Sequence, residues 1–321
     1  QDAIDAAALV GGGTVYIPPG NFLTAGGHIL PPGVTIEGST QFLGSKITLD
    51  TTHSGTEIFI IEELTYDVII KDIDMRSDVS GVGIGIYSHG SYPNSSGGFR
   101  VSNCRFSGFA KSMYTHTDSS PNKWQCDYWL IDNCRFEIPN NCIGIHCDTP
   151  FMDVLFQATQ FYMVQGAANN SIACKFDAIG LCTFVQCYGN GDNTVTPICS
   201  APGVLNTLLP KYFVQLNGIH GSLSFVDCHI EAIQYGLENN YDDAGNWPIK
   251  VIGSVMGFRV ALNATCNYVS QGSNYLAKQL LINDNNISVW SHGDYISDTL
   301  GFCYTSDTSK DLFVLGSGVT T

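Results

Sequence analysis

Three aspartates, Asp118, Asp148 and Asp177, follow short strand-like segments in consecutive parts of the chain. Asp118 and Asp148 each lie 15 residues after an asparagine, Asn103 and Asn133, which predicts that they stack on adjacent turns of a repeat, with Asp177 on the next. Neighbouring β-strands lie about 4.8 Å apart, and alternate strands about 10 Å. Retaining glycosidases hold two carboxyls about 5 to 5.5 Å apart, and inverting ones about 6.5 to 9.5 Å. The three aspartates are therefore candidate catalytic residues for cleaving a glycosidic bond.

Cationic and aromatic side chains accompany these aspartates. His116 and His146 each lie 13 residues after the same two asparagines, and Lys175 lies two residues before Asp177. The segments around Gln215 and Glu238 continue the same polar line. Flat aromatic rings bury the C–H faces of sugars well, and Trp124 lies in a long segment that could cover this line. The candidate substrate-binding residues are therefore His116, His146, Lys175, Trp124 and Glu238.

A structural role for the aspartates is the alternative. Asp118 and Asp148 each begin a short segment that contains a proline, and aspartate is a common turn residue. The histidines and Lys175 would then be counter-charges that make an acidic ladder tolerable.

The elements that must position these side chains follow from an internal repeat. Residues 99–106, 129–136 and 223–230 share one frame, in which an alternating apolar segment is followed by Asn or Asp, then Cys, then a second alternating segment. Weaker copies give eight repeats at intervals of 25 to 41 residues, and the residues before the Cys position are Asp72, Asn103, Asn133, Ala158, Gln186, Asp227, Gly253 and Asp284. Short alternating strands at this period predict an all-β fold, a single-stranded right-handed parallel β-helix.

The frame also assigns two structural columns. Asn and Asp tolerate left-handed backbone conformations better than other non-glycine residues, so the positions before the Cys are expected to be bends. The cysteines that follow, Cys104, Cys134, Cys187 and Cys228, are expected to stack as buried thiols. Ligands on parallel rungs do not converge tetrahedrally, so we expect neither a metal site nor a cofactor.

Composition narrows the function classes. The 321 residues include 34 Gly, 44% hydrophobic residues and only 13% charged ones, the profile of a turn-rich β protein. The formal net charge of −15 disfavours nucleic acid and anionic membranes as partners. The longest apolar runs are of strand length, so no membrane insertion is expected.

The first residues predict a cap for the solenoid. Residues 2–10 read as a short Ala-rich helix that stops at Gly11–Gly13, so we divide the chain into a capping helix at 1–13 and a parallel β-helix domain at 14–321. The helix together with GGGTVYIPPGNFLTAGGHILPPGVTIEGS resembles the opening of pectate-lyase-like β-helix domains of phage tailspikes and receptor-binding depolymerases. In that family more chain commonly precedes the helix, so we expect a longer protein.

The resemblance implies a homotrimer on a virion tail spike or fibre, or otherwise extracellular, that attaches to host cells by binding or cleaving a surface polysaccharide. The polygalacturonase signatures NTD, a double Asp, GHG and RIK are not found as such, so no catalytic residues are carried over. In tailspikes of this family, catalytic acids lie on the solenoid face or between subunits. The resemblance therefore keeps Asp192, Glu231 and Glu238 as candidate catalytic residues.

The sequence therefore favours a glycoside hydrolase, a tailspike-like endoglycosidase that acts through paired carboxylates. A non-catalytic carbohydrate-binding adhesin or structural spike is the first alternative. A polysaccharide lyase is the second, and it would enlist Lys175, His146 and Arg135 as base and electrophile.

Overall fold

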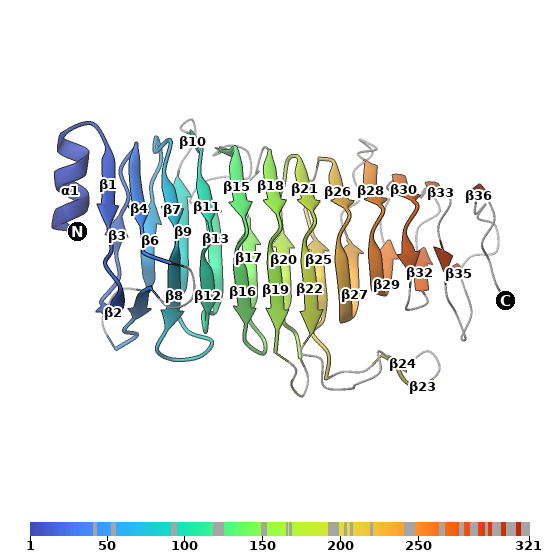
Figure 1. Ribbon diagram of the computed structural model, residues 1–321. Helices are drawn as coiled ribbons and strands as arrows, with labels where there is room; N and C mark the ends of the chain where they lie inside the picture. Colours follow the sequence, from blue (N-terminus) through green and yellow to red (C-terminus); the bar gives the residue numbers. More distant parts are fainter. Residues whose placement is uncertain are drawn as a thin grey trace.

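The computed structural model describes residues 1–40, 44–52, 56–90, 95–117, 125–148, 153–164, 166, 169–191, 199–201, 204–205, 208–218, 221–240, 248–262, 267–275, 279–282, 288–292, 295–296, 303–305 and 313–315. Within them the chain forms a parallel β-helix whose coils follow one another along a single axis (Figure 1). This is the predicted right-handed all-β solenoid.

One long sheet takes one strand from each coil and contains 12 strands among the described residues. In order along the axis these are β1 (Gly13–Tyr16), β4 (Val34–Glu37), β7 (Ile69–Lys71), β11 (Arg100–Ser102), β15 (Trp129–Asp132), β18 (Val154–Gln157), β21 (Cys182–Val185), β26 (Leu223–Val226), β28 (Pro248–Ile252), β30 (Asn267–Gln271), β33 (Ser288–His292) and β36 (Phe313–Leu315).

A second sheet consists of two parallel runs joined by two long strands, β27 (His229–Asn239) and β29 (Val255–Leu262). Before these strands, the first run is β2 (Gly20–Thr24), β5 (Ser45–Leu49), β8 (Ile73–Ser77), β12 (Arg105–Ser107), β16 (Arg135–Ile138), β19 (Gln160–Met163) and β22 (Tyr188–Gly191). The second run is β3 (His28–Ile29), β6 (Glu57–Ile61), β9 (Ile84–Gly90), β13 (Lys111–Thr117), β17 (Ile143–Cys147), β20 (Ile172–Phe176) and β25 (Tyr212–Leu216). Beyond them lie β31 (Asn274–Tyr275) and β34 (Tyr295–Ile296) in the first run, and β32 (Gln279–Ile282) and β35 (Cys303–Thr305) in the second.

Two small pairs lie outside these sheets. The strands β10 (Ser95–Gly97) and β14 (Gln125–Asp127) are parallel, and β23 (Cys199–Ala201) and β24 (Val204–Leu205) are antiparallel. The helix α1 (Asp2–Leu9) lies at the N-terminal end of the solenoid, where it packs on β1 and β4 and buries Ile4 (Figure 1). The helix ends at Leu9, one residue before the predicted end, and the glycines at 11–13 that follow it adopt positive φ.

The repeat frame correctly located the bends. All seven positions before the Cys position that the structure describes have positive φ between 47° and 60°: Asp72, Asn103, Asn133, Ala158, Gln186, Asp227 and Gly253. The eighth, Asp284, lies outside the described residues. Asn133 also donates from Nδ2 to Asn103 Oδ1 at 2.8 Å, and Asn103 donates to Asp72 at 3.1 Å, so the bends form a ladder along the axis.

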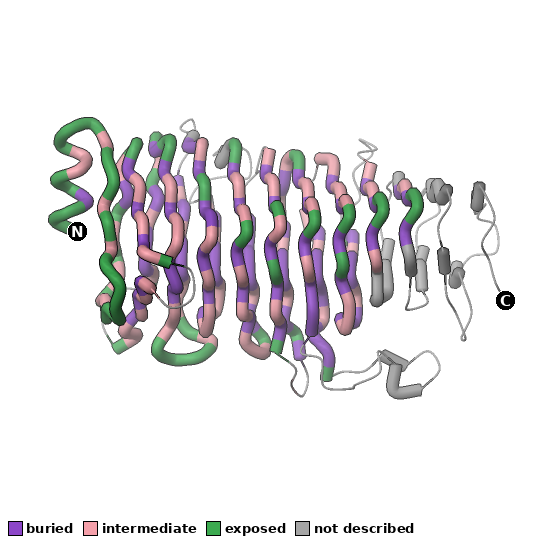
Figure 2. The backbone as a smooth tube through the Cα atoms, in the orientation of Figure 1, coloured by how far each residue is buried: buried purple, intermediate pink, exposed green. Residues whose placement is uncertain are grey.

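Stacked aromatic rings fill the interior. Phe106, Phe136 and Phe161 form one stack with centroids 4.8 and 5.1 Å apart, and Phe156, Phe184 and Phe225 form another. The predicted thiol column is confirmed, since Cys104, Cys134, Cys187 and Cys228 are buried thiols that form no disulfide among the described residues. Buried and less buried residues alternate along the strands (Figure 2), so alternate side chains face outward.

Candidate functional site

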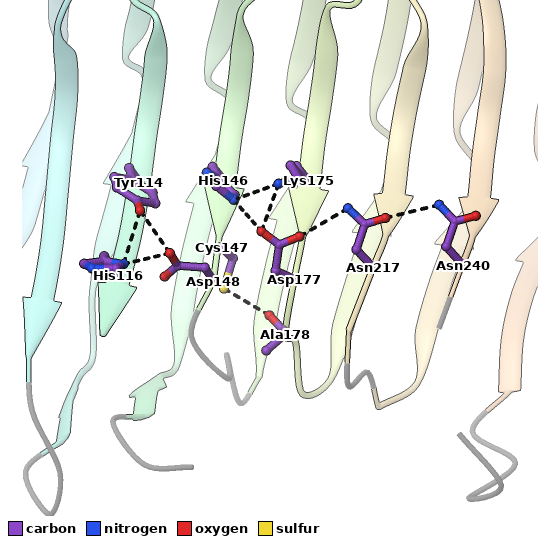
Figure 3. A network of polar contacts seen from close by, with 10 residues as sticks. All are labelled: Tyr114, His116, His146, Cys147, Asp148, Lys175, Asp177, Ala178, Asn217 and Asn240. Atoms are coloured by element: carbon purple, nitrogen blue, oxygen red, sulfur yellow. Dashed lines mark hydrogen bonds and ion pairs between the residues drawn. The ribbon is translucent and has the colours of Figure 1, made fainter. Parts of the chain in front are cut away.

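The outer face of the run from β9 to β27 carries two adjacent columns of polar and aromatic side chains, with one residue of each column per strand. The first column, in strand order, is Tyr87, Tyr114, His146, Lys175, Gln215 and Glu238. The second column lies two residues further along each strand and consists of His89, His116, Asp148, Asp177, Asn217 and Asn240. Figure 3 shows the central part of both columns.

Asp148 and Asp177 are neighbours on adjacent rungs. Cys147 pairs with Phe176 in the parallel register, so the next residue of each strand, Asp148 and Asp177, also lie side by side. The ladder continues through them, because the Asp177 amide donates to the Cys147 carbonyl at 2.7 Å. The separation of adjacent rungs is about 4.8 Å. Asp148 and Asp177 therefore lie on adjacent rungs of the same face.

Asp177 is held by three donors. Its Oδ2 accepts hydrogen bonds from His146 Nε2 at 2.7 Å and from Lys175 Nζ at 3.0 Å, and its Oδ1 accepts one from Asn217 Nδ2 at 3.2 Å. Burial raises the pKa of this carboxyl, but the three hydrogen bonds outweigh burial and hold the pKa well below its ordinary value. Asp177 is therefore ionised at neutral pH.

Asp148 has a different set of partners. Its Oδ2 accepts hydrogen bonds from Tyr114 Oη at 2.9 Å and from His116 Nδ1 at 2.7 Å. Burial, followed by the bond to Asp148, raises the pKa of Tyr114, so the phenol keeps its proton and acts as the donor. Among the residues that the structure describes, the buried Oδ1 atom of Asp148 has no hydrogen-bond partner. Asp148 thus contacts a phenol and an imidazole, both of which carry exchangeable protons.

His146 positions Asp177 and is poorly placed to act as a base. A carboxylate only accepts, so Nε2 carries the proton that is donated to Asp177, and the lone pair of the neutral ring is on Nδ1. That Nδ1 atom is buried and has no hydrogen-bond partner in the described part of the chain. Burial, supported by the nearby charges of Lys111 and Lys175, lowers the pKa of His146 against the opposing effect of Asp177. The ring is therefore neutral at neutral pH.

A third carboxylate follows two rungs further along the axis. Glu238 accepts hydrogen bonds from Gln215 Nε2 at 2.8 Å, Asn240 Nδ2 at 2.9 Å and Tyr212 Oη at 3.2 Å. Asn240 also donates to Asn217, which donates to Asp177 (Figure 3). An amide chain therefore links Glu238 to the carboxyl pair.

One predicted register is wrong. The matching distances of His116 and His146 from Asn103 and Asn133 predict that the two histidines stack, but Tyr114 pairs with His146, and His116 lies beside Asp148. The bend before β13 is shorter than the bend before β17. Ser107 pairs with Glu137 and Lys111 with Ile143, so the paired positions on either side of the bends are separated by 4 and 6 positions in the sequence.

Other predicted site residues lie elsewhere. Asp118, Trp124 and Asp192 lie outside the described residues. Arg135 and Glu231 belong to the other run of strands, where Arg135 lies 4.3 Å from the Tyr162 ring and Glu231 pairs with His229 at 3.2 Å. The structure thus brings together Asp148, Asp177, His116, His146, Lys175 and Glu238 on one face.

The sequence analysis gave no role to Lys111 or Tyr114. Tyr114 contacts Asp148, and Lys111 Nζ lies 3.3 Å from the centroid of the Tyr114 ring. The signal for Tyr114 was its position two residues before His116, which places both side chains on one face of a strand. Lys111 had no such signal, because it lies beside the bend whose length the repeat did not fix.

Among the described residues, no group of three or more His, Cys, Asp or Glu residues is arranged to hold a metal ion. In the same part of the chain, no helix is both long enough and apolar enough to span a membrane.

No family model matches the chain, and no curated protein matches it. Solved structures do resemble it. The A-module of mannuronan C-5 epimerase AlgE6 from Azotobacter vinelandii matches with 13% identity and a TM-score of 0.51, covering 100% of this chain and 92% of the other. PfbA, a surface adhesin of Streptococcus pneumoniae, matches with 14% identity and a TM-score of 0.50, covering 92% and 88%.

A tailspike protein mutant of Escherichia coli bacteriophage HK620, in complex with a hexasaccharide, matches with 11% identity and a TM-score of 0.50. The alignment covers 98% of this chain but only 59% of that one, so the chain spans little more than half of the tailspike. At these identities the likeness concerns the fold, and it agrees with the tailspike-type β-helix expected from the sequence.

Proposed function

We propose that the face from β9 to β27 binds an extended polysaccharide and cleaves a glycosidic bond by hydrolysis, with Asp148 and Asp177 as the reacting carboxyls. The observation that carries this proposal is their placement on adjacent rungs of one outer face. A rung separation of about 4.8 Å is close to the 5 to 5.5 Å of retaining glycosidases. The proposal therefore commits to retention of anomeric configuration.

The unlike surroundings of the two carboxyls support separate roles. Asp177 is kept ionised by Lys175, His146 and Asn217, as a nucleophile requires. Asp148 contacts Tyr114 and His116 and is assigned the acid and base steps. The cycle starts with Asp148 protonated: its proton passes to the leaving oxygen as the glycosidic bond breaks and Asp177 forms a bond to the anomeric carbon. Water then displaces Asp177 from the anomeric carbon and gives a proton to Asp148, which restores both carboxyls.

The lyase alternative has less support on this face. A lyase needs a base that reaches a C–H bond of the sugar. Sequence reasoning offered His146, but its Nε2 donates to Asp177 and its Nδ1 is buried. The basic atom of His146 therefore has no access to a bound sugar.

A non-catalytic adhesin is the second candidate, and one observation favours it. Asp177 and Glu238 each accept three hydrogen bonds from protein donors, and the amide chain of Asn217 and Asn240 joins them. Such a network is what a rigid binding surface needs even without chemistry. In both versions the partner is a polysaccharide. A virion or other extracellular location and a homotrimer belong to the proposal, and light scattering of the purified protein tests the trimer.

The deciding experiment uses a panel of bacterial capsular and O-antigen polysaccharides. Each polymer is incubated with the wild-type chain and analysed by mass spectrometry and by NMR of the new reducing ends. The proposal predicts saturated shorter chains with retained anomeric configuration, and no products with Asp148→Asn or Asp177→Asn. Intact but bound polymer would support the adhesin, and unsaturated products would support the lyase.

A further inference from the structure

Lys111 contacts an aromatic ring and, among the described residues, no carboxylate. Its Nζ lies over the face of the Tyr114 ring, 3.3 Å from the centroid. Among the residues that the structure describes, no carboxylate lies within ion-pair distance of it. Lys71 and Lys175, by contrast, pair with Glu37 at 3.1 Å and Asp177 at 3.0 Å.

This arrangement is costly for the folded protein. Lys111 is half-buried, and burial lowers the pKa of its ammonium group, an effect that the charges of Asp148 and Asp177 only partly offset. The chain has 29 acidic residues against 14 Lys and Arg, so carboxylates are not scarce. A half-buried ammonium without a contacting counter-ion, beside a candidate reaction centre, is typical of a ligand-binding charge.

A second cation lies close by. Lys175 Nζ is 3.5 Å from His146 Nε2 and retains 25% of its side-chain exposure. Both Lys111 and Lys175 act electrostatically on His146 and lower its pKa. Lys111 lies over the Tyr114 ring, which stacks on the His146 ring with centroids 4.9 Å apart, so each of the two ammonium groups contacts one ring of this stack.

We propose that Lys111, assisted by Lys175, binds an anionic substituent of the polysaccharide, such as a carboxylate or sulfate group, beside the bond that is cleaved. This inference rests on the proposed function and names its substrate class, an acidic polysaccharide. The anion supplies the counter-ion that Lys111 lacks. The net charge of −15 repels such a polymer at long range, so the preference must come from contacts at these lysines.

The test compares two forms of one polymer. The probes are a capsular polysaccharide that contains glucuronic acid and the same polymer after chemical reduction of its carboxylates to alcohols. Binding is measured by biolayer interferometry in an Asp148→Asn background, so that the polymer is not cleaved. Lys111→Gln removes the charge, Lys111→Arg retains it, and Lys250→Gln on β28 is the matched control for loss of one positive charge. Dextran sulfate is a third probe that distinguishes sulfate from carboxylate.

We expect the acidic polymer to bind at least about tenfold more tightly than the reduced polymer. Lys111→Gln abolishes this preference, Lys111→Arg keeps most of it, and Lys250→Gln leaves it unchanged. Equal affinity for the two polymers in the starting background, an equal loss of both with Lys111→Gln, or no binding of either polymer overturns the inference.

Turnover by the wild-type chain is scored separately, so the two proposals can fail independently. If neutral and acidic polymers are cleaved at the same rate, the acidic substrate class is contradicted but the proposed hydrolysis is not. If binding prefers the acidic polymer in a way that depends on Lys111 but no polymer is cleaved, the anion site is supported and the proposed hydrolysis is contradicted.

Discussion

The imidazole of His146 lies flat against the phenol ring of Tyr114, with centroids 4.9 Å apart and ring planes 17° apart. The polar atom of each ring holds a different carboxyl, because Tyr114 Oη donates to Asp148 and His146 Nε2 donates to Asp177. One ring stack therefore fixes both carboxyls relative to each other. A change to either ring is expected to affect the spacing of the pair, whereas a change to the hydroxyl alone affects only Asp148.

Tyr114→Phe separates these two effects. The variant keeps the ring that packs on His146 and removes only the hydrogen bond to Asp148. If Asp148 exchanges protons with the leaving group, we expect kcat to fall by about ten- to hundredfold with little change in KM. Turnover of the cleaved polysaccharide measures this. Tyr16→Phe, which changes an exposed tyrosine of β1, is the control. Equal activity of the two variants would show that the Tyr114 hydroxyl takes no part in the reaction.

Asp177→Asn is expected to change the pH dependence of stability. The folded pKa of Asp177 lies below its unfolded value of about 3.9, so its stabilising effect is present above about pH 4 and is lost as the pH falls through the folded pKa. Since the group is partly exposed, we expect the variant to be less stable at pH 7 by only about 1 kcal/mol.

Urea denaturation of both proteins at pH 7 and at pH 3 checks this prediction. The difference in unfolding free energy between wild type and variant should shrink at pH 3. At that pH the carboxyl of Asp177 takes up a proton in the unfolded wild-type chain, and this uptake favours unfolding. A difference that stays constant with pH would mean that Asp177 contributes through packing rather than charge.

His146 should titrate below its ordinary pKa of about 6.5, because burial favours the neutral ring. As the pH falls below about 6.5, the unfolded chain takes up this proton before the folded chain does, so His146 lowers stability on acidification. NMR of the imidazole C–H signals, assigned with His146→Gln, measures the midpoint. A midpoint at or above about 6.5 would contradict the neutral ring.

The fold was predictable because each bend carries its own local signal. Asn103 and Asn133 mark left-handed bends through their residue type, and the cysteine after each marks the buried column. The pairing of side chains across coils was less predictable, since it depends on the length of the bends between strands. Ser107 to Lys111 and Glu137 to Ile143 differ by two residues, and a shift of two keeps the same face but changes the neighbour. Asp148 and Asp177 were therefore correctly placed together, whereas His116 and His146 were not.

The buried thiol column should accept hydroxyl groups. Thr159 occupies the position of Cys134 in the next coil, and its Oγ1 donates to the carbonyls of Ile131 and Gln157 at 3.2 and 3.0 Å. Cys134 Sγ makes the equivalent contacts to Val101 and Asp132. We therefore expect Cys134→Ser to cost less than about 1 kcal/mol and Cys134→Leu to cost about 1 to 3 kcal/mol through overpacking. Thermal unfolding monitored by circular dichroism measures both, and a larger loss for Ser than for Leu would contradict the equivalence.

Ala158 offers a position at which the protein can be stabilised. It occupies the bend that Asn and Asp occupy in other coils, with φ of 47°, a conformation that costs an L-residue with a Cβ atom about 1 kcal/mol. Ala158→Gly removes this strain but increases the freedom of the unfolded chain, so the expected net gain in stability is small, about 0.5 kcal/mol.

Ala158→Asn should stabilise the protein by a similar amount, because its side chain can also join the amide ladder of the bends. Ala158→Val should destabilise by more than about 1 kcal/mol, since a β-branched residue tolerates this conformation poorly. Urea denaturation of the three variants gives the ranking, and a Val variant as stable as the Gly variant would show that the bend is not strained.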